Sequence, residues 1–388
     1  MSHRRHLRVA ALALAVSLPL WAAAQATPVT AGHVAAQYAT VVHASYEDSL
    51  AAAQELNQAI AAFVAAPSAA GLEGARKAWQ AAREWYGQTE AFRFYAGPID
   101  DDKGPEGRLN AWPLDEAYID SVKGKPGSGF INDRKVVISK ANLSRLNERG
   151  GEENIAAGWH AIEFLLWGQD QNDKGPGNRS ADDFIDGKAP NADRRRQALL
   201  TMSELLQDDL RSLVLAWTPG SRNYRAAFER GGQDSLRKII VGLGSLSRGE
   251  LAGERMEVAL NTQDQEDEHS CFSDNTHRDI VNNAKGIQNA WLGRYQRRDG
   301  SVLSGAALRD LVAAADAPLA ERTSQQIAAS VARAEAIPAP FDRAIIGGKE
   351  APGRQAIQAT IDSLVQQSKD LVASASAVGI TRLTLVKP

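Results

Sequence analysis

Apolar residues recur every three or four positions along most of the chain, which is the period of a helix with one buried face. Between residues 34 and 65, for example, Val41, Leu50, Leu56 and Ile60 contribute to this pattern. Alanine is abundant, and alanine has the highest helix propensity. Interrupted by Gly, Pro and Ser, the pattern predicts helices at 34–65, 72–95, 155–167, 192–217, 223–260, 275–295, 305–337 and 351–377.

These helices divide evenly between the two halves of the chain. The pattern therefore predicts an all-α fold of two four-helix bundles, with domains at 27–195 and 196–388. A long irregular stretch at 99–152 interrupts the first bundle, and loops of that length are usually functional.

The two halves are expected to be related by duplication, because residues 158–163 can be laid over residues 286–291. In that overlay His160 meets Gln288, and Glu163 meets Trp291. The His and Glu side chains would then remain in the first copy only.

The first 26 residues have the pattern of a cleavable signal peptide. Three arginines precede an apolar run that ends in Ala24-Gln25-Ala26. The run is short for a membrane span, and a membrane anchor is the less favoured alternative. Cleavage removes three of the 44 basic residues and leaves 41 against 47 acidic ones, a net charge of −6. We expect a periplasmic protein without an integral membrane segment, and an outer-membrane association is left open.

The charge balance and the cysteine count exclude several classes of protein. A nearly neutral chain is not suited to nucleic acid, which requires a broad basic face. The single cysteine, Cys271, excludes an intrachain disulfide. The sequence also lacks a Gly-rich phosphate loop, a haem-attachment motif, a nucleophile elbow and a His-Glu-x-x-His motif. The inverted zinc motif fails because position 164 is Phe.

The clearest candidate for chemistry is the pair His160 and Glu163. Residues three apart share a face of a helix, so the imidazole and the carboxylate can reach one cation. The neighbouring side chains are apolar, so both groups need a partner. Further ligands are expected from Glu90 and Asp115, and an oxygen-rich set of this kind suits ferric iron, manganese, calcium or an oxygen-tolerant zinc. The alternative is that the pair only forms hydrogen bonds with itself or a neighbouring helix.

A second candidate lies at 264–277, where two His, one Cys and several acids occur in fourteen residues. His269, Cys271, Asp274 and His277 are secondary candidates for metal ligands. The alternative is a solvated acidic loop in which Ser273 or Asp274 caps the next helix.

Residues 158–163 match the Gly-x-His-x-x-Glu signature of the imelysin family, which includes iron-regulated exported proteins. Residues 92–100, 112–115 and 269–277 also resemble that family. The resemblance implies two four-helix bundles with a site near their junction, bacterial export and a link to iron acquisition. It implies that His160 and Glu163 are the primary ligands, with Glu90 and Asp115 supplementary.

The candidate residues and the family resemblance together lead to three functional hypotheses. The favoured hypothesis is a periplasmic metal-binding protein that captures iron, with an inner- or outer-membrane iron transport component as its partner. The alternative is an imelysin-type zinc metallopeptidase, in which Glu163 would be the catalytic residue. The third is a module that binds a siderophore, haem or an acidic polysaccharide in an aromatic cavity.

Overall fold

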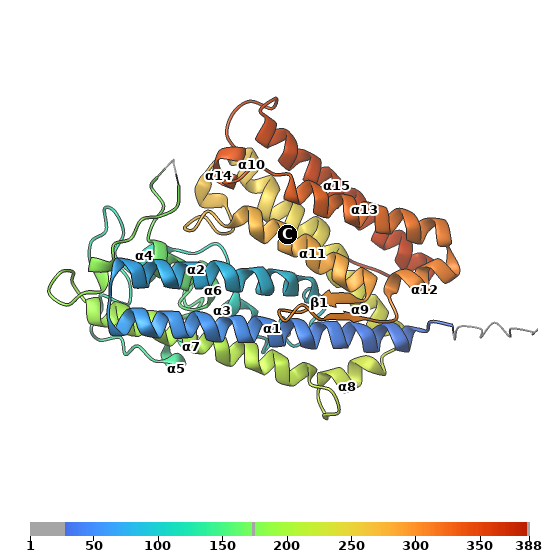
Figure 1. Cartoon of the computed structure of the whole chain (residues 1–388), viewed down its shortest axis with the longest axis horizontal. Helices are drawn as coiled ribbons and strands as arrows, with labels where there is room; N and C mark the ends of the chain where they lie inside the picture. The colour runs from blue at the N-terminus through green and yellow to red at the C-terminus, as the bar shows by residue number, and fades with distance from the viewer. Residues whose placement is uncertain (1–27, 173–174, 386–388) are drawn as a thin grey trace, which may run out of the picture.

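The structure is a computed structural model that describes residues 28–172 and 175–385. Four helices form the first bundle and lie side by side in Figure 1. α1 packs against α2 and α7, and α6 packs against α2 and α7. These helices are α1 (Ala31–Ala65), α2 (Ala69–Tyr86), α6 (Gly158–Trp167) and α7 (Ala192–Trp217).

The second group of helices packs against the first along the junction seen in Figure 1. α13 packs on α11 and α15, and α15 packs on α9 and on a π-helical segment, η3. Its main elements are α9 (Gln233–Ser245), η3 (Leu246–Glu257), α11 (Thr276–Leu292), α13 (Ala317–Glu335) and α15 (Pro352–Ala377). The prediction of an all-α fold is confirmed. Duplication stays a prediction.

Short elements connect the long helices. In the first half they are the 3-10 helix η1 (Gly87–Phe92), α3 (Glu106–Leu109), α4 (Glu116–Ile119), α5 (Lys140–Leu146) and the 3-10 helix η2 (Ala181–Phe184). In the second half they are α8 (Tyr224–Glu229), α10 (Val258–Thr262), the 3-10 helix η4 (Gln265–Asp267), α12 (Leu308–Ala315) and α14 (Phe341–Ala344). An antiparallel hairpin joins β1 (Arg294–Gln296) to β2 (Val302–Ser304).

Several predicted helices are shorter than their apolar pattern. The helix predicted at 72–95 ends at Tyr86 and continues only as η1, where a Cβ on Gly87 would lie 2.8 Å from the side chain of Asn282 on α11. The helix predicted at 223–260 is broken after α8, where Gly232 has a φ of 56°. The helix predicted at 305–337 restarts at α13, which Asp316 caps through the main-chain N–H of Leu319.

The predicted helix at 275–295 is also shorter. It begins at Thr276 and ends before Gly293, whose φ of 56° turns the chain into the hairpin. The predicted domain boundary between residues 195 and 196 falls inside α7, which packs on α1 and α6 of the first bundle.

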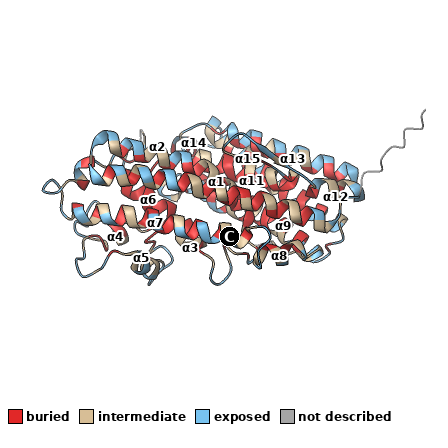
Figure 2. Cartoon of the chain, turned by 60° about the horizontal axis from the view of Figure 1, so that its bottom comes forward, coloured by how far each residue is buried: buried red, intermediate tan, exposed pale blue. Residues whose placement is uncertain are grey.

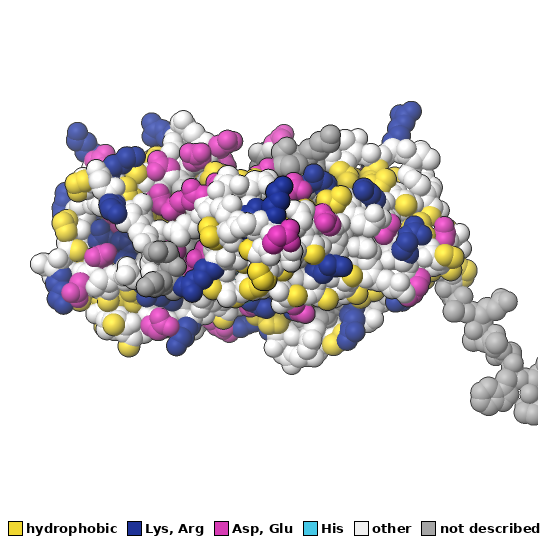
Figure 3. Space-filling view, turned by 90° about the horizontal axis from the view of Figure 1, so that it is seen from above, with side chains coloured by type: hydrophobic (Ala, Val, Ile, Leu, Met, Phe, Trp, Pro, Cys, Tyr) yellow, Lys and Arg dark blue, Asp and Glu magenta, His cyan; other side chains and the backbone are white. Residues whose placement is uncertain are grey.

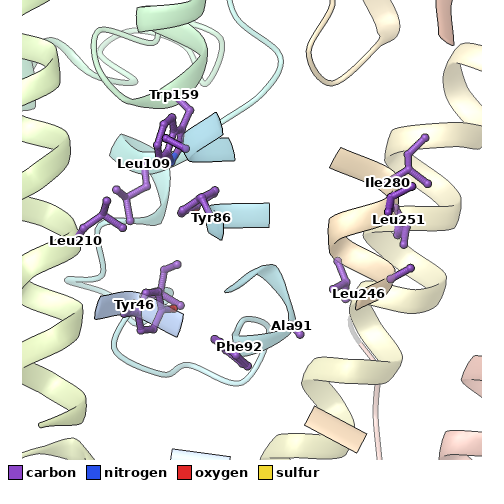
Figure 4. Close-up of a cluster of buried hydrophobic side chains, with 14 of the residues drawn as sticks. Tyr46, Tyr86, Ala91, Phe92, Leu109, Trp159, Leu210, Leu246, Leu251 and Ile280 are labelled. Atoms are coloured by element: carbon purple, nitrogen blue, oxygen red, sulfur yellow. The ribbon is translucent and has the colours of Figure 1, made fainter. Parts of the chain in front are cut away.

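The core is continuous between the two groups of helices. Figure 2 shows the buried residues on the facing sides of the helices and the exposed ones on their outer sides. Side chains from both groups contribute to the cluster in Figure 4, among them Tyr86, Phe92 and Trp159 from the first half and Leu251 and Ile280 from the second. Because α11 packs on η1 and α2, residues from either half can meet at this junction.

No helix in the described part of the chain is long and apolar enough to cross a membrane. The predicted signal peptide at 1–26 lies outside the described residues. Figure 3 shows basic and acidic side chains interspersed on one face, with acidic ones gathered in one area of it.

Candidate metal centre

Helix α6 supplies the first side chains of the site and is buried along its whole length. It begins at Gly158, whose φ of 90° lies in the left-handed region. A Cβ at this position would lie 2.5 Å from the carbonyl oxygen of Arg108 and 2.6 Å from that of Leu109. Glycine therefore permits both the turn into α6 and the close approach of α6 to α3.

His160 and Glu163 lie one turn apart on α6, and both side chains are fully buried. The Nδ1 atom of His160 is 2.9 Å from Oε2 of Glu163. The other carboxylate oxygen accepts hydrogen bonds from Ser273, at 3.0 Å from its main-chain nitrogen and 2.6 Å from its hydroxyl. Glu163 therefore holds the His160 ring at Nδ1, which leaves Nε2 for another partner.

That partner is His269, which lies in the segment between η4 and α11. The Nε2 atoms of His160 and His269 are 3.2 Å apart, although the two residues are 109 positions apart in the sequence. On its other side, His269 places Nδ1 at 3.1 Å from Oδ2 of Asp279. Each imidazole is therefore backed by a carboxylate at Nδ1 and faces the other imidazole with Nε2.

Asp279, on α11, is itself held firmly. Arg83 of α2 donates to both of its carboxylate oxygens, at 3.2 and 2.9 Å, and the Ser270 hydroxyl donates at 2.5 Å. Arg83 also donates to Asn110 Oδ1 at 2.6 Å. Metal-binding histidines typically have such a carboxylate behind them, because it fixes the ring and raises the basicity of the other nitrogen.

Burial and neighbouring charges shift the pKa values of the groups in these contacts. Burial alone would raise the pKa of Asp279, but Arg83 and His269 outweigh it and hold that pKa well below its usual range. Burial lowers the pKa of His269 to about 4 and raises the pKa of Glu163 to about 8. With Glu163 protonated and both imidazoles neutral, we assign the donors as Glu163 to His160 Nδ1, His160 Nε2 to His269 Nε2, and His269 Nδ1 to Asp279. A cation between the two Nε2 atoms would replace the middle proton.

A cavity of about 470 Å³ is lined in part by His269. Asn110 and Trp112 also line this cavity. The Nδ2 atom of Asn110 is 3.4 Å from Nε2 of His269, and the ring centroid of Trp112 is 5.0 Å from that of His160. The cavity wall contains two arginines, Arg93 and Arg255, and a larger number of acidic side chains. The acidic residues are Glu106, Glu148, Glu152, Glu250, Glu254, Glu266 and Asp267. The negative excess favours cations over anions.

Comparison with known proteins decides the family. The Imelysin family model matches residues 42–371 of this chain. The chain is also 30% identical over 347 residues to Iron-regulated protein A of Synechococcus elongatus, which covers 86% of this chain and 84% of that protein. The chain belongs to the imelysin family.

Two solved structures share the imelysin fold. One is an iron-regulated protein A precursor from Parabacteroides distasonis, with a TM-score of 0.68 at 20% identity, covering 91% of this chain and 97% of the other. The second is an imelysin-like protein from Psychrobacter arcticum, with a TM-score of 0.63 at 14% identity, covering 92% and 99%. At these identities the likeness shows the fold alone.

Of the two supplementary ligands expected from the imelysin resemblance, Glu90 lies in η1, between two arginines. Its Oε2 accepts from Arg93 and from Arg255, both at 2.7 Å. Burial alone would raise the pKa of Glu90, but the two arginines outweigh it and lower that pKa to about 2. The hydrogen-bond partners of Glu90 are thus the arginines of the cavity wall.

Asp115, the other supplementary candidate, caps the short helix α4. Its Oδ1 accepts from the main-chain N–H of Ala117 at 3.0 Å, and its own N–H donates to the carbonyl of Glu153. The contacts of Asp115 are therefore those of a helix N-cap.

The four secondary candidates in 264–277 have different surroundings in the structure. His269 joins His160, whereas Cys271 is buried with a pKa that burial raises. Asp274 and His277 are half-buried. The capping alternative is not observed, because α11 starts after Asn275 without a side-chain cap and Ser273 instead donates to Glu163.

Three members of this site could not be found from the sequence alone. Asp279, Arg83 and Ser270 have no fixed spacing to the signature, and their contacts arise from the packing of α2 and α11. In the described part of the chain, no three His, Cys, Asp or Glu side chains already surround one point as metal ligands. The two Nε2 atoms are the donors that the structure brings together.

Proposed function

We propose that this protein is an exported, periplasmic metal-binding protein of bacterial iron uptake, and that it takes an iron ion at His160 and His269. The observation that carries the proposal is the approach of the two Nε2 atoms to 3.2 Å inside the protein. Both rings are buried, and both Nδ1 atoms are engaged by carboxylates. Two imidazoles presented in this way fit a transition-metal ion.

The donor atoms favour ferrous iron over ferric iron. Glu163 contacts His160 at Nδ1, Asp115 caps α4, and Glu90 binds two arginines through Oε2 while its Oε1 has no partner. The two imidazole nitrogens are therefore the principal donors of the proposed site. Imidazole nitrogen suits Fe²⁺ and Zn²⁺, whereas an all-oxygen set suits harder ions. Zinc therefore remains a competing cargo, and the measurement below includes it.

The surroundings agree with a cation as cargo. The cavity that reaches His269 carries an excess of acidic side chains, which attract cations and repel anionic chelates. The curated relative is named for regulation by iron. Export and delivery to a membrane transport component complete the proposal, as expected from the sequence at 1–26 and from the family.

Calorimetry of the purified mature chain with Fe²⁺, under anaerobic conditions, and with Zn²⁺ tests the site. We expect one ion per chain, and a loss of at least 100-fold in affinity in His160→Ala and in His269→Ala. His43→Ala is the matched control, because His43 also has a glutamate partner, Glu47, but lies on α1. Unchanged stoichiometry and affinity in both site variants would refute the proposal.

The peptidase alternative is less well supported by the contacts. Zinc peptidase chemistry requires a carboxylate that can take a proton from a metal-bound water. Both oxygens of Glu163 are engaged, by His160 and Ser273, and both oxygens of Asp279 are engaged by Arg83. Cleavage of unfolded proteins that is blocked by a chelator and lost in Glu163→Gln would reverse this preference.

A further inference from the structure

A second cavity lies at the junction of the two groups of helices. Its volume is about 470 Å³, which is within the range of small-molecule sites. Its lining comes from α2, η1, α11 and the hairpin, and Figure 1 shows α11 beside α2. We define this junction groove by five of its uncharged lining side chains, Trp85, Gln88, Asn282, Gln288 and Gln296. None of these five contributes to the proposed iron site.

One wall of the junction groove is formed by close contact between α11 and η1. A Cβ on Gly286 would lie 2.3 Å from the carbonyl oxygen of Gln88, so glycine permits the two main chains to approach. The side-chain amide of Gln88 is held at both ends. Its Oε1 accepts from Asn289 Nδ2 at 2.9 Å, and its Nε2 donates to the carbonyl of Glu84 at 2.9 Å. A ligand would therefore meet a wall that is already ordered.

The charged side chains of the junction groove are all paired with partners outside it. One acidic and three basic residues belong to the lining, and each forms an ion pair. The pairs are Glu84 with Arg278, Lys285 with Glu335, Arg297 with Asp48 and Arg298 with Glu55. Because no charge in the lining lacks a partner, the groove favours an uncharged ligand.

Asn282 supplies the junction groove with a donor that the protein does not use. The residue is 1% exposed, and its Nδ2 is buried without a hydrogen-bond partner. Most buried polar atoms in proteins have a partner, because the loss of hydration is otherwise uncompensated. The amides of Gln288 and Gln296 and the half-buried indole of Trp85 line the same groove. Asn282 thus has a donor for a ligand that brings an acceptor.

We propose that the junction groove binds an uncharged saccharide of one or two sugar rings. A side-chain amide carries both donors and an acceptor, and a hydroxyl group has the same dual character. The amides of Asn282, Gln288 and Gln296 therefore match a ligand with several hydroxyls. An oxygen of the sugar would accept from Asn282 Nδ2, and Trp85 offers an apolar ring surface to the C–H groups of a sugar ring.

A saccharide suits these features better than other ligands of similar size. Small ions would require a charge without a partner, and each charge in the lining has one. Short peptides have charged termini, which would lose hydration in the groove without gaining a counter-charge. A purely apolar ligand would leave the Nδ2 of Asn282 without an acceptor.

Saturation-transfer NMR of the full mature chain with neutral sugars, in the presence of a chelator, tests the proposal. The sugars are glucose, galactose, N-acetylglucosamine, cellobiose, maltose and lactose. We expect transfer to at least one of them, strongest at ring C–H protons. Asn282→Leu, which removes the donor at similar volume, and Trp85→Ala should each weaken the affinity for that sugar at least tenfold.

Two controls separate lost recognition from lost folding. Asn282→Leu should unfold at the temperature of the parent or above it, because it removes an unsatisfied buried amide. Gln288→Ala should weaken sugar binding, whereas Gln325→Ala should leave it unchanged. Gln325 is an exposed glutamine on α13 and does not line the groove, so the chemical change is the same at both positions.

Three results would overturn the proposal. One is the absence of transfer to all six neutral sugars, and another is unchanged affinity in both Asn282→Leu and Trp85→Ala. The third is tighter binding of an acidic disaccharide, digalacturonate, than of any neutral sugar. Sugar binding that persists in His160→Ala separates the junction groove from the iron site, so either proposal can fail alone.

Discussion

At the scale of single residues, His160 and Glu163 have different roles. His160 presents Nε2 to the site, whereas Glu163 contacts Nδ1 and the loop residue Ser273. In the proposed iron site, Glu163 is thus a positioning residue for the imidazole. The spacing His-x-x-Glu brings the two side chains into direct contact, and the role of Glu163 as a metal ligand stays a prediction.

Glu163→Gln should weaken Fe²⁺ or Zn²⁺ binding by about 10–100-fold without abolishing it, since it alters the support of a ligand. Calorimetry measures this change. Glu90→Gln is the comparison, because Glu90 contacts arginines and should change the affinity by less than about threefold. A larger loss in Glu90→Gln than in Glu163→Gln would contradict this division of roles.

Addition of Zn²⁺ at pH 7 should release about one proton per ion bound, because the cation replaces the proton shared by the two Nε2 atoms. The pKa of Glu163, raised by burial to about 8, places that proton in the site at neutral pH. Calorimetry in buffers with different ionisation enthalpies counts released protons. The count should fall above pH 8, and a count of zero at pH 7 would contradict the proton assignment.

At the scale of elements, the entry into α6 depends on one glycine. Gly158 combines a positive φ with a close approach to the carbonyls of Arg108 and Leu109. Both features must be disturbed by any side chain at that position. The signature therefore contains glycine for a reason separate from the chemistry of His160.

Gly158→Ala should reduce the free energy of unfolding by about 2–4 kcal/mol, from backbone strain together with overlap against α3. Denaturant unfolding measures it. Gly74→Ala is the matched control, since Gly74 lies within α2 with nothing within 4 Å of a new Cβ, and it should gain up to about 1 kcal/mol. Equal effects at the two positions would show that the approach to α3 is unimportant.

The helices could be predicted from the sequence because their apolar faces repeat at the helical period. Their breaks were harder to predict. η1 and the π-helical segment η3 continue the apolar pattern of α2 and α9 with altered winding, which periodicity alone does not detect. In the site, the pair on α6 was predictable because its members are three apart. Asp279 and Arg83 were not, because only the packing of α11 on α2 brings them together.

At the scale of the whole molecule, buried ion pairs join the two groups of helices. Glu90 belongs to the first half and Arg255 to the second, and Arg83 and Asp279 are divided in the same way. The side chains of all four are almost completely buried. Loss of one partner leaves an uncompensated charge at the junction, which is costly.

Stability should therefore fall in acid through Glu90. Its folded pKa of about 2 lies below its ordinary value of 4.5, so its contribution is complete above pH 4.5 and is lost as the pH falls through 2. The shift corresponds to about 3 kcal/mol. Glu90→Gln should lower stability at pH 7 by roughly this amount and flatten the profile between pH 2 and 4.5, as measured by urea unfolding. An unchanged slope would assign the acid sensitivity to other carboxylates.

The distance of 109 positions between His160 and His269 has a consequence for biogenesis. A chain that has folded only its first half carries the whole signature and yet lacks half of the imidazole pair. If the pair binds iron as we propose, binding has to wait for contacts between distant parts of the chain, which form slowly. Under the proposed function, a newly exported chain could not sequester iron prematurely, and a bound ion would mark a completely folded chain.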